Sequence, residues 1–395
     1  METAKTTCGK ILFCILLLGF FSPCYAQETT FRDWINPRES VYVNWTIVPD
    51  EKDPLRISIR PRDSQQSTEG RKILFLFPKK SSAYDTALSK ILDVFADKGI
   101  FADVMVVNFK GKPELGRAAL QYAKMVDFDL IYSMGSATTT YLVKHFKNEM
   151  IPVLSVCSKD PVLMGQMEDY EKGSGTNLAF TSLNVPIKVQ ITYLQSLIKE
   201  LKNIGVLYAT KNKSAVITQV EPLRKAAEAV QIDVIDIAVE DRSKAAEELV
   251  QKIPEAILRM RQSDPELKRS VFWITGSTSV FRELSTINAH SGKVPVLSVV
   301  PDLVKEGSES ALLSIGVSFE SNAHLAAIYG TMILTKKAEA GGLAVGVVEP
   351  PDISINFNKV RSIGLKIPFS FFESANFIYD YDGKLVRSNG RNLVR

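Results

Sequence analysis

The sequence contains few of the residues on which disulfides and metal sites depend. It has four cysteines and three histidines among 395 residues, and three of those cysteines lie within the first 26 residues. Only Cys157 remains beyond them, which excludes a disulfide within the rest of the chain. His145, His290 and His324 stand in no metal-ligand spacing. We therefore expect neither a metal ion nor a cofactor.

Motifs typical of catalysis and nucleotide chemistry are also missing. The chain has no G-x-S-x-G elbow, no P-loop and no dinucleotide-binding glycine pattern. Cys157 has no histidine near it in the sequence, which argues against a catalytic thiol. The formal net charge is only +4 and there is no basic block, so no nucleic acid partner is indicated. We expect a protein that is not an enzyme; turnover of a bound ligand remains an alternative.

Long hydrophobic runs are confined to the N-terminus. Two lysines precede an apolar run over residues 11–21, and "SPCYAQ" follows. This run is shorter than the ~18 apolar residues needed to span a bilayer. The pattern predicts a signal peptide over 1–26, cleaved after Ala26, and an exported protein. A version lipidated at Cys24 is the alternative, and Pro23 directly before that cysteine argues against it.

Most of the chain alternates short β-rich runs with amphipathic helical stretches. The alternation begins near residue 71, and its strands are apolar throughout, which predicts a parallel sheet covered on both faces. Before it, residues 27–70 read as an N-terminal extension in which "VYVNWTIV" and "LRISIRP" suggest a hairpin, followed by the flexible join "DSQQSTEG". Residues 369–395 read as a C-terminal tail.

The α/β pattern occurs twice. "IPVLSVCSKDPV" at 151–162 returns as "VPVLSVVPDLV" at 294–304, with Pro-Val-Leu-Ser-Val shared letter for letter. Gly135-Ser136 after "LIYSM" returns as Gly276-Ser277 after "VFWIT". The strand, polar Ser-Ala loop and helix over 72–99 return over 203–230. These three matches in the same order predict two α/β domains of like topology. Ligands of open parallel sheets bind beyond the carboxyl ends of strands, and the repeated polar residues fall there, so we expect a small molecule between two facing edges.

Several of these segments resemble one known family. "GSATT", "IPVLSVCSKDPVLMG", "GSGTNLAFTS" and "NIGVLYATKNKSAVITQVEPLRKAA" are similar to ABC-transporter substrate-binding proteins, in particular the branch that carries tryptophan and other aromatic amino acids. The resemblance covers about 72–368. It implies an α/β fold of the type 1 periplasmic-binding-protein kind, with two similar doubly wound parallel-sheet domains joined by hinge crossovers. The expected units are 71–182 plus 306–345 and 183–305 plus 346–368.

The resemblance also implies a set of ligand-binding positions. Lys159 stands where the family pattern has a hydroxyl residue, and the loop at Gly276 lacks the family's acidic residue. Each of these positions also has a purely structural alternative. Asp160 could hold a ligand ammonium or cap a helix, and the hydroxyl residues could bind a carboxylate or only cap helices. The aromatic residues could stack on a ligand or pack in the core. Asp302 is a repeat-matched acid at a hinge or helix start. The candidate ligand-binding residues are Ser82, Tyr84, Gly135, Ser136, Thr138, Asp160, Asn177, Ser277, Thr278 and Phe319.

Two functions fit this sequence. The first is the periplasmic solute-binding component of an ABC importer, a monomer that captures a small polar or amino-acid-like ligand in an interdomain cleft and delivers it to a membrane permease. The second keeps the fold but is a ligand-sensing receptor that feeds a membrane kinase or chemoreceptor. The extension over 27–70 and the tail over 369–395 motivate this alternative, because both exceed a minimal binding protein.

Overall fold

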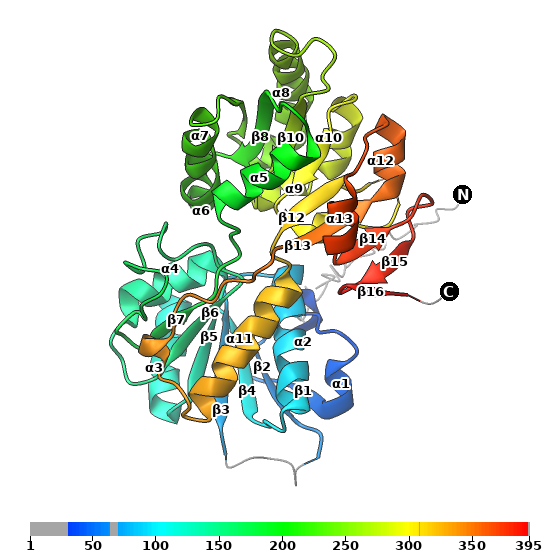
Figure 1. The fold of residues 1–395 in the computed structure, drawn as a ribbon. Helices are drawn as coiled ribbons and strands as arrows, with labels where there is room; N and C mark the ends of the chain where they lie inside the picture. The colour runs from blue at the N-terminus through cyan, green and yellow to red at the C-terminus, as the bar shows by residue number, and fades with distance from the viewer. Residues whose placement is uncertain (1–30, 64–69, 308, 394–395) are drawn as a thin grey trace, which may run out of the picture.

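The computed structural model describes residues 31–63, 70–307 and 309–393. The expected signal peptide over 1–26 and most of the join over 63–70 lie outside the described residues. Within these described ranges, no helix is long and apolar enough to cross a membrane. The chain forms two α/β domains that lie one above the other in Figure 1, each built around its own sheet.

The first domain contains a seven-stranded sheet in the order β1-β2-β4-β3-β5-β6-β7. From β4 to β7 all neighbours are parallel, whereas β1 and β2 form an antiparallel hairpin that pairs with the β4 edge. The strands are β1 (Trp45–Pro49), β2 (Arg56–Pro61), β3 (Lys72–Phe77), β4 (Asp103–Asn108), β5 (Leu130–Met134), β6 (Val153–Val156) and β7 (Leu178–Phe180).

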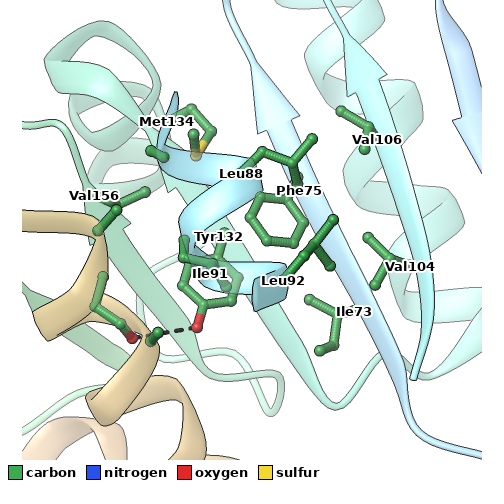
Figure 2. Packing of buried hydrophobic residues seen from close by; sticks show 14 of the residues in the cluster. Ile73, Phe75, Leu88, Ile91, Leu92, Val104, Val106, Tyr132, Met134 and Val156 are labelled. Atoms are coloured by element: carbon green, nitrogen blue, oxygen red, sulfur yellow. Dashed lines mark hydrogen bonds between the residues drawn. The ribbon is translucent and has the colours of Figure 1, made fainter. Parts of the chain in front are cut away.

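Helices cover both faces of the first sheet because its central strands are apolar on both sides. Alternate residues of β3 point to opposite faces, so Phe75 packs under α2 (Ser82–Asp97) and α11 (Phe319–Leu334), while Leu74 packs against α3 (Pro113–Val126) and α4 (Gly135–His145). Figure 2 shows the first of these two cores. The short helices η1 (Phe31–Asp33) and α1 (Val41–Asn44) precede the hairpin.

The second domain contains a nine-stranded sheet in the order β16-β15-β14-β13-β12-β11-β10-β8-β9. The strands from β9 to β12 are parallel, and β13 is antiparallel to β12. The strands are β8 (Asn203–Ala209), β9 (Asp233–Val239), β10 (Ser270–Ile274), β11 (Val296–Ser298), β12 (Leu313–Gly316), β13 (Asp352–Asn356), β14 (Phe377–Tyr379), β15 (Leu385–Ser388) and β16 (Arg391–Asn392).

The second sheet is also covered on both faces. One core contains residues of α5 and α7, and the other contains residues of α8 and α10. A single helical stretch joins α6 to α7 through the π-helical turn η3. The helices of this domain are α5 (Ile187–Leu197), α6 (Lys213–Ala215), η3 (Val216–Val220), α7 (Glu221–Glu228), η4 (Arg242–Lys244), α8 (Ala245–Met260), α9 (Thr278–Phe281), α10 (Leu284–His290), η5 (Pro301–Leu303), α12 (Phe357–Ile363) and α13 (Phe369–Ser374). The short helix η6 (Ala340–Gly342) packs in the first domain.

The two domains share one strand order. Numbering the parallel strands within each domain in chain order, both sheets run 2-1-3-4-5: β4-β3-β5-β6-β7 in the first and β9-β8-β10-β11-β12 in the second. The two Pro-Val-Leu-Ser-Val segments become β6 and β11, the fourth parallel strand of each domain. The doubly wound architecture expected from the sequence is therefore confirmed.

Three connections join the domains, and Figure 1 shows them as thin links between the two lobes. The chain crosses between β7 and α5, between β12 and α11, and again before β13. The first and third crossings lie side by side, because Thr181 and Gly346 form a parallel bridge and the N–H of Ser182 donates to the carbonyl of Gly346 at 2.9 Å.

The element boundaries differ from expectation in three places. The strand β12 belongs to the second sheet, so the second crossing comes after residue 316 and not at 305. The extension supplies β1 and β2 to the first sheet, and its residues 41–44 are helical where a strand was expected. The tail supplies β14, β15 and β16 to the second sheet. The added strands and the place of β12 come from long-range strand pairing that local sequence does not encode.

Candidate functional site

The strand order places the site at two switch points. In an open α/β sheet, a crevice opens where the connections from two adjacent strands leave toward opposite faces of the sheet, and here that is between β3 and β5 and between β8 and β10. Residues beyond the carboxyl ends of both sheets meet where the domains contact each other. We call this region the domain junction; it comprises residues 78–84, 135–138 and 157–160 of the first domain and 210–219, 276–279 and 301–302 of the second.

The start of α4 lies at the first switch point. Its N-cap residue, Met134, supplies no side-chain hydrogen bond, so the first N–H groups of α4 lack a capping acceptor. Gly135 has φ +78°, and an added Cβ would collide with the hydroxyl of Tyr84. Ser136 Oγ accepts a hydrogen bond from the backbone N–H of Lys159 at 2.9 Å. Thr138 is fully buried, and its hydroxyl has no hydrogen-bond partner in the described part of the chain.

The loop after β6 is held by Asp160. Its Oδ1 accepts from the backbone N–H groups of Val162 and Leu163, both at 2.9 Å, and its Oδ2 accepts from the hydroxyl of Tyr170 at 2.7 Å. Both carboxylate oxygens are therefore already occupied in the turn that follows. Replacing Asp160 with alanine would remove three hydrogen bonds, so this variant would report on folding as well as on binding.

Lys159 crosses the junction. Only 9% of its surface is exposed, and its ammonium lies so close to Gly276 of the second domain that a Cβ there would collide with Nζ. No hydrogen bond or ion pair to this ammonium is formed by any described residue. Burial lowers the pKa of Lys159 to about 8. A buried cation without a counter-charge is costly, so it marks a position where an external acceptor would be favourable.

The second-domain side of the junction is arranged around Gly276. Its backbone N–H donates to Gln219 Oε1 at 2.9 Å, and Gln219 belongs to the π-helical turn η3. Ser277 is fully buried; its Oγ accepts from the N–H of Ala209 and from Asn212 Nδ2, both at 3.3 Å. Thr278 is half-buried and begins α9. Isolated π turns are frequent at functional sites.

Further cations lie near the junction at exposed positions. Lys79, in the loop after β3, has a lowered pKa because of burial and because of the positive charges of Arg282 and Arg242 in the other domain. None of these three side chains forms an ion pair within the described residues. With Lys159, they give the junction a positive potential that favours anions.

The crossing between β12 and α11 forms another wall of the junction. Phe319 packs against buried residues of both domains. Asp302 is exposed to water on one side, but the surrounding protein raises the pKa of its carboxyl to about 6, and the negative charge of Asp352 acts in the same direction. The backbone N–H of Phe319 and the charge of Arg38 oppose this rise.

The remaining predicted residues lie in different surroundings. Ser82 is exposed at the start of α2. Tyr84 is buried and packs edge-on against Phe77, with ring centroids 5.5 Å apart. Asn177 lies at the opposite, amino end of β6, where its Nδ2 donates to the carbonyls of Phe146 and Ile151 at 3.0 and 2.8 Å. The structure thus does not bring Asn177 to the junction.

Sequence reasoning missed two buried amides at the crossings. Asn184 Oδ1 accepts from the N–H of Asp160 at 3.1 Å, and its Nδ2 donates to the carbonyl of Thr218 in the second domain at 3.1 Å. Asn322 Oδ1 accepts from the N–H of Cys157 at 2.8 Å, and its Nδ2 donates to the carbonyl of Ser182 at 3.2 Å. Asn184 lies directly beside the first expected crossing, which was its signal, whereas Asn322 lies far from the expected second crossing at 305 and had none.

The thiol of Cys157 is poorly suited to nucleophilic chemistry. It is buried, and burial together with the charge of Asp302 raises its pKa well above the ordinary range, which keeps it protonated. In the part of the chain that the structure describes, no group of histidine, cysteine, aspartate and glutamate residues could hold a metal ion.

Comparisons with solved structures give the fold. A conserved domain protein from Vibrio cholerae superposes with a TM-score of 0.61 at 19% identity, over 79% of this chain and 100% of that one. An ABC domain in complex with L-Trp from Streptococcus pneumoniae gives 0.60 at 19% identity, over 78% and 100%. A ligand-free, open substrate-binding protein with adhesive properties from Clostridium difficile gives 0.60 at 18% identity, over 77% and 98%.

These likenesses establish a type 1 periplasmic-binding fold, as expected from the sequence. A comparison with curated proteins found no match. The family model for the ABC transporter substrate binding protein matches residues 78–376, well over half of the chain. The chain therefore belongs to the ABC transporter substrate-binding protein family.

Proposed function

We propose that the protein is the solute-binding component of an ABC importer, acting outside the cytoplasmic membrane and capturing a small polar or amino-acid-like solute between its two domains. Family membership supports the binding role. The observation that carries the proposal is the unpaired ammonium of Lys159, buried between the facing carboxyl edges of the two sheets.

Capture would work by closure about the three crossings. A ligand shifts an equilibrium between open and closed forms only by its difference in affinity for them. Groups from both domains reach the junction: the start of α4 and Lys159 from the first, Gly276 and Gln219 from the second. A solute that touches both sets favours the closed form, which a membrane permease then recognises. We propose that the protein acts as a monomer.

A sensory receptor remains the second candidate. The two terminal segments that motivated it are built into the sheets as β1–β2 and β14–β16, so they are not free appendages for docking. Genes for a permease and an ATPase beside this one would favour import, and a histidine kinase gene would favour sensing.

Titration calorimetry of the purified protein against amino acids, organic acids and sugars tests the proposal. We expect saturable binding of at least one small solute with one site per chain. If the protein is folded and free of bound ligand and yet binds none of the panel, the proposed function is wrong.

A further inference from the structure

The charge at the domain junction carries information about the ligand. Lys159 stands in the loop after β6, which the family resemblance implies for ligand binding, and it forms no hydrogen bond or ion pair with any described residue. Its side chain is more than nine-tenths buried and ends against the backbone of Gly276. An ammonium in this position is stabilised when an acceptor with negative charge enters beside it.

The start of α4 is a second position for an anion, separated from the ammonium of Lys159 by the length of that lysine side chain. The backbone N–H of Lys159 binds Ser136 Oγ at the first turn of α4, while its ammonium reaches the opposite domain. That helical turn has no side-chain cap, and the fully buried Thr138 within it has an unpartnered hydroxyl. Free N–H groups at the start of an 11-residue helix attract a carboxylate or phosphate.

Few acids are free to hold a ligand's ammonium group. The carboxylate of Asp160 already accepts three hydrogen bonds from its own loop, from Val162, Leu163 and Tyr170. Glu320 is paired with Arg38 at 3.0 Å and with Lys90 at 3.5 Å. Asp302 remains, and it lies toward the crossing beside Phe319. The unpaired charge that lies against Gly276 is the positive charge of Lys159.

We propose that the ligand is a small organic molecule with two acidic groups, one bound at the start of α4 and the other by the ammonium of Lys159. This inference rests on the proposed function and narrows it: Lys159 is the residue that determines specificity. Lys79, Arg242 and Arg282 are exposed and close enough for their charges to interact, so they add positive charge near the same junction. Dicarboxylates and phosphorylated carboxylic acids share this chemistry.

Calorimetric titration of the wild type and of Lys159→Met tests the inference. The probes are succinate, glutarate, glutamate, phosphoglycolate and, as ligands with a single carboxylate, alanine, leucine and tryptophan. We expect the wild type to bind one or more of the diacids and the variant to bind them roughly 30-fold or more weakly, as for a lost charge-assisted hydrogen bond. Lys159→Arg should retain part of the affinity.

A thermal melt of Lys159→Met shows whether lost binding reflects lost folding. Because the substitution removes an unpaired buried charge, we expect the unliganded variant to melt at the same temperature as the wild type or higher. Lys188→Met, at an exposed position on α5, is the matched control and should leave binding unchanged. Binding of diacids by Lys159→Met with wild-type affinity overturns the inference. A wild type that binds only ligands with a single carboxylate also overturns the inference, but the proposed function then stands. A wild type that binds none of the probes overturns both the inference and the proposed function.

Discussion

Two neighbouring threonines of α4 have opposite roles. Both are fully buried, but Thr139 Oγ1 donates to the carbonyl of Gly135 at 3.1 Å and lies 3.0 Å from Ser133 Oγ, whereas Thr138 Oγ1 has no partner within the described structure. The contrast separates a hydroxyl used for folding from one that is free for a ligand.

We predict that Thr138→Val and Thr139→Val behave in opposite ways. Thr138→Val should leave the free energy of unfolding within about 0.5 kcal/mol of wild type, or raise it, and weaken ligand binding. Thr139→Val should cost about 1–2 kcal/mol of stability and leave binding nearly intact. Urea unfolding and calorimetric titration of both variants check this; equal effects of the two variants on binding would contradict it.

Lys159 should also give stability an unusual pH dependence. Its folded-state pKa of about 8 lies below the ordinary 10.5, so below pH 8 it is protonated in both folded and unfolded chains, and the folded state bears the cost of the buried charge. Between pH 8 and 10.5 the unfolded chain binds more protons, so stability contributed by this group rises with pH.

We predict that Lys159→Met removes this rise. At pH 7 the variant should be more stable than wild type by about 2 kcal/mol, and the difference should shrink toward pH 10. Urea unfolding at both pH values measures it, with Lys188→Met as the control for the loss of an exposed lysine. A difference that is independent of pH would show that Lys159 is not an unpaired buried cation.

At the scale of elements, α11 is attached to the first sheet through Tyr132. This residue of β5 stacks on Phe75 with centroids 4.6 Å apart, and its hydroxyl donates to the carbonyl of Ala326 at 3.2 Å (Figure 2). Gly330, one turn further along α11, allows the close approach, because a Cβ there would collide with the same hydroxyl. Since α11 follows the second crossing, this contact fixes one end of a hinge.

A double-mutant cycle tests this attachment. Tyr132→Phe should cost about 1 kcal/mol for the lost hydrogen bond, and Gly330→Ala about 2 kcal/mol for overpacking. The double variant should cost clearly less than the sum, because removing the hydroxyl makes room for the new methyl group. Gly205→Ala, whose Cβ would meet Phe272 and Met260 in the other domain, is the control and should combine additively with Tyr132→Phe. Additivity in the first pair would contradict the account.

The central strands of both sheets were predictable, whereas their edges were not. The two Pro-Val-Leu-Ser-Val segments are apolar on both faces and are followed by turns, so they identify β6 and β11 locally. The strand β12 has only four residues. Its place in the second sheet depends on pairing with β11 on one side and, on the other, with β13, which follows the third crossing. The strands β14 to β16, which the sequence presented as a tail, likewise depend on pairing beyond β13, whereas β2 lies within "LRISIRP", which suggested a hairpin.

The candidate site was predictable in position more than in detail. Repeated residues at strand ends identified the edge of each sheet, and Lys159 stood out as a departure from the family pattern. The hydrogen bonds of the site could not be predicted from the sequence. They engage the carboxylate of Asp160 and the hydroxyl of Ser277, and they hold the side-chain amide of Asn177 at the amino end of β6.

At the scale of the whole molecule, the account requires the ligand to touch both domains at once. A second possible ligand site is a depression of about 1050 Å³ at the amino ends of the strands of the second sheet. It is lined by residues that precede β8 and β10. Ligands of doubly wound sheets bind at the carboxyl edge, which favours the domain junction.

Amide hydrogen exchange with and without the tightest-binding solute tests the two-domain site most directly. The account predicts added protection at residues 135–138 and 157–160 of the first domain and, in the same experiment, at residues 276–279 of the second. Protection confined to one domain, or found at residues 196–200 and 264–269 around the rival depression, would contradict it.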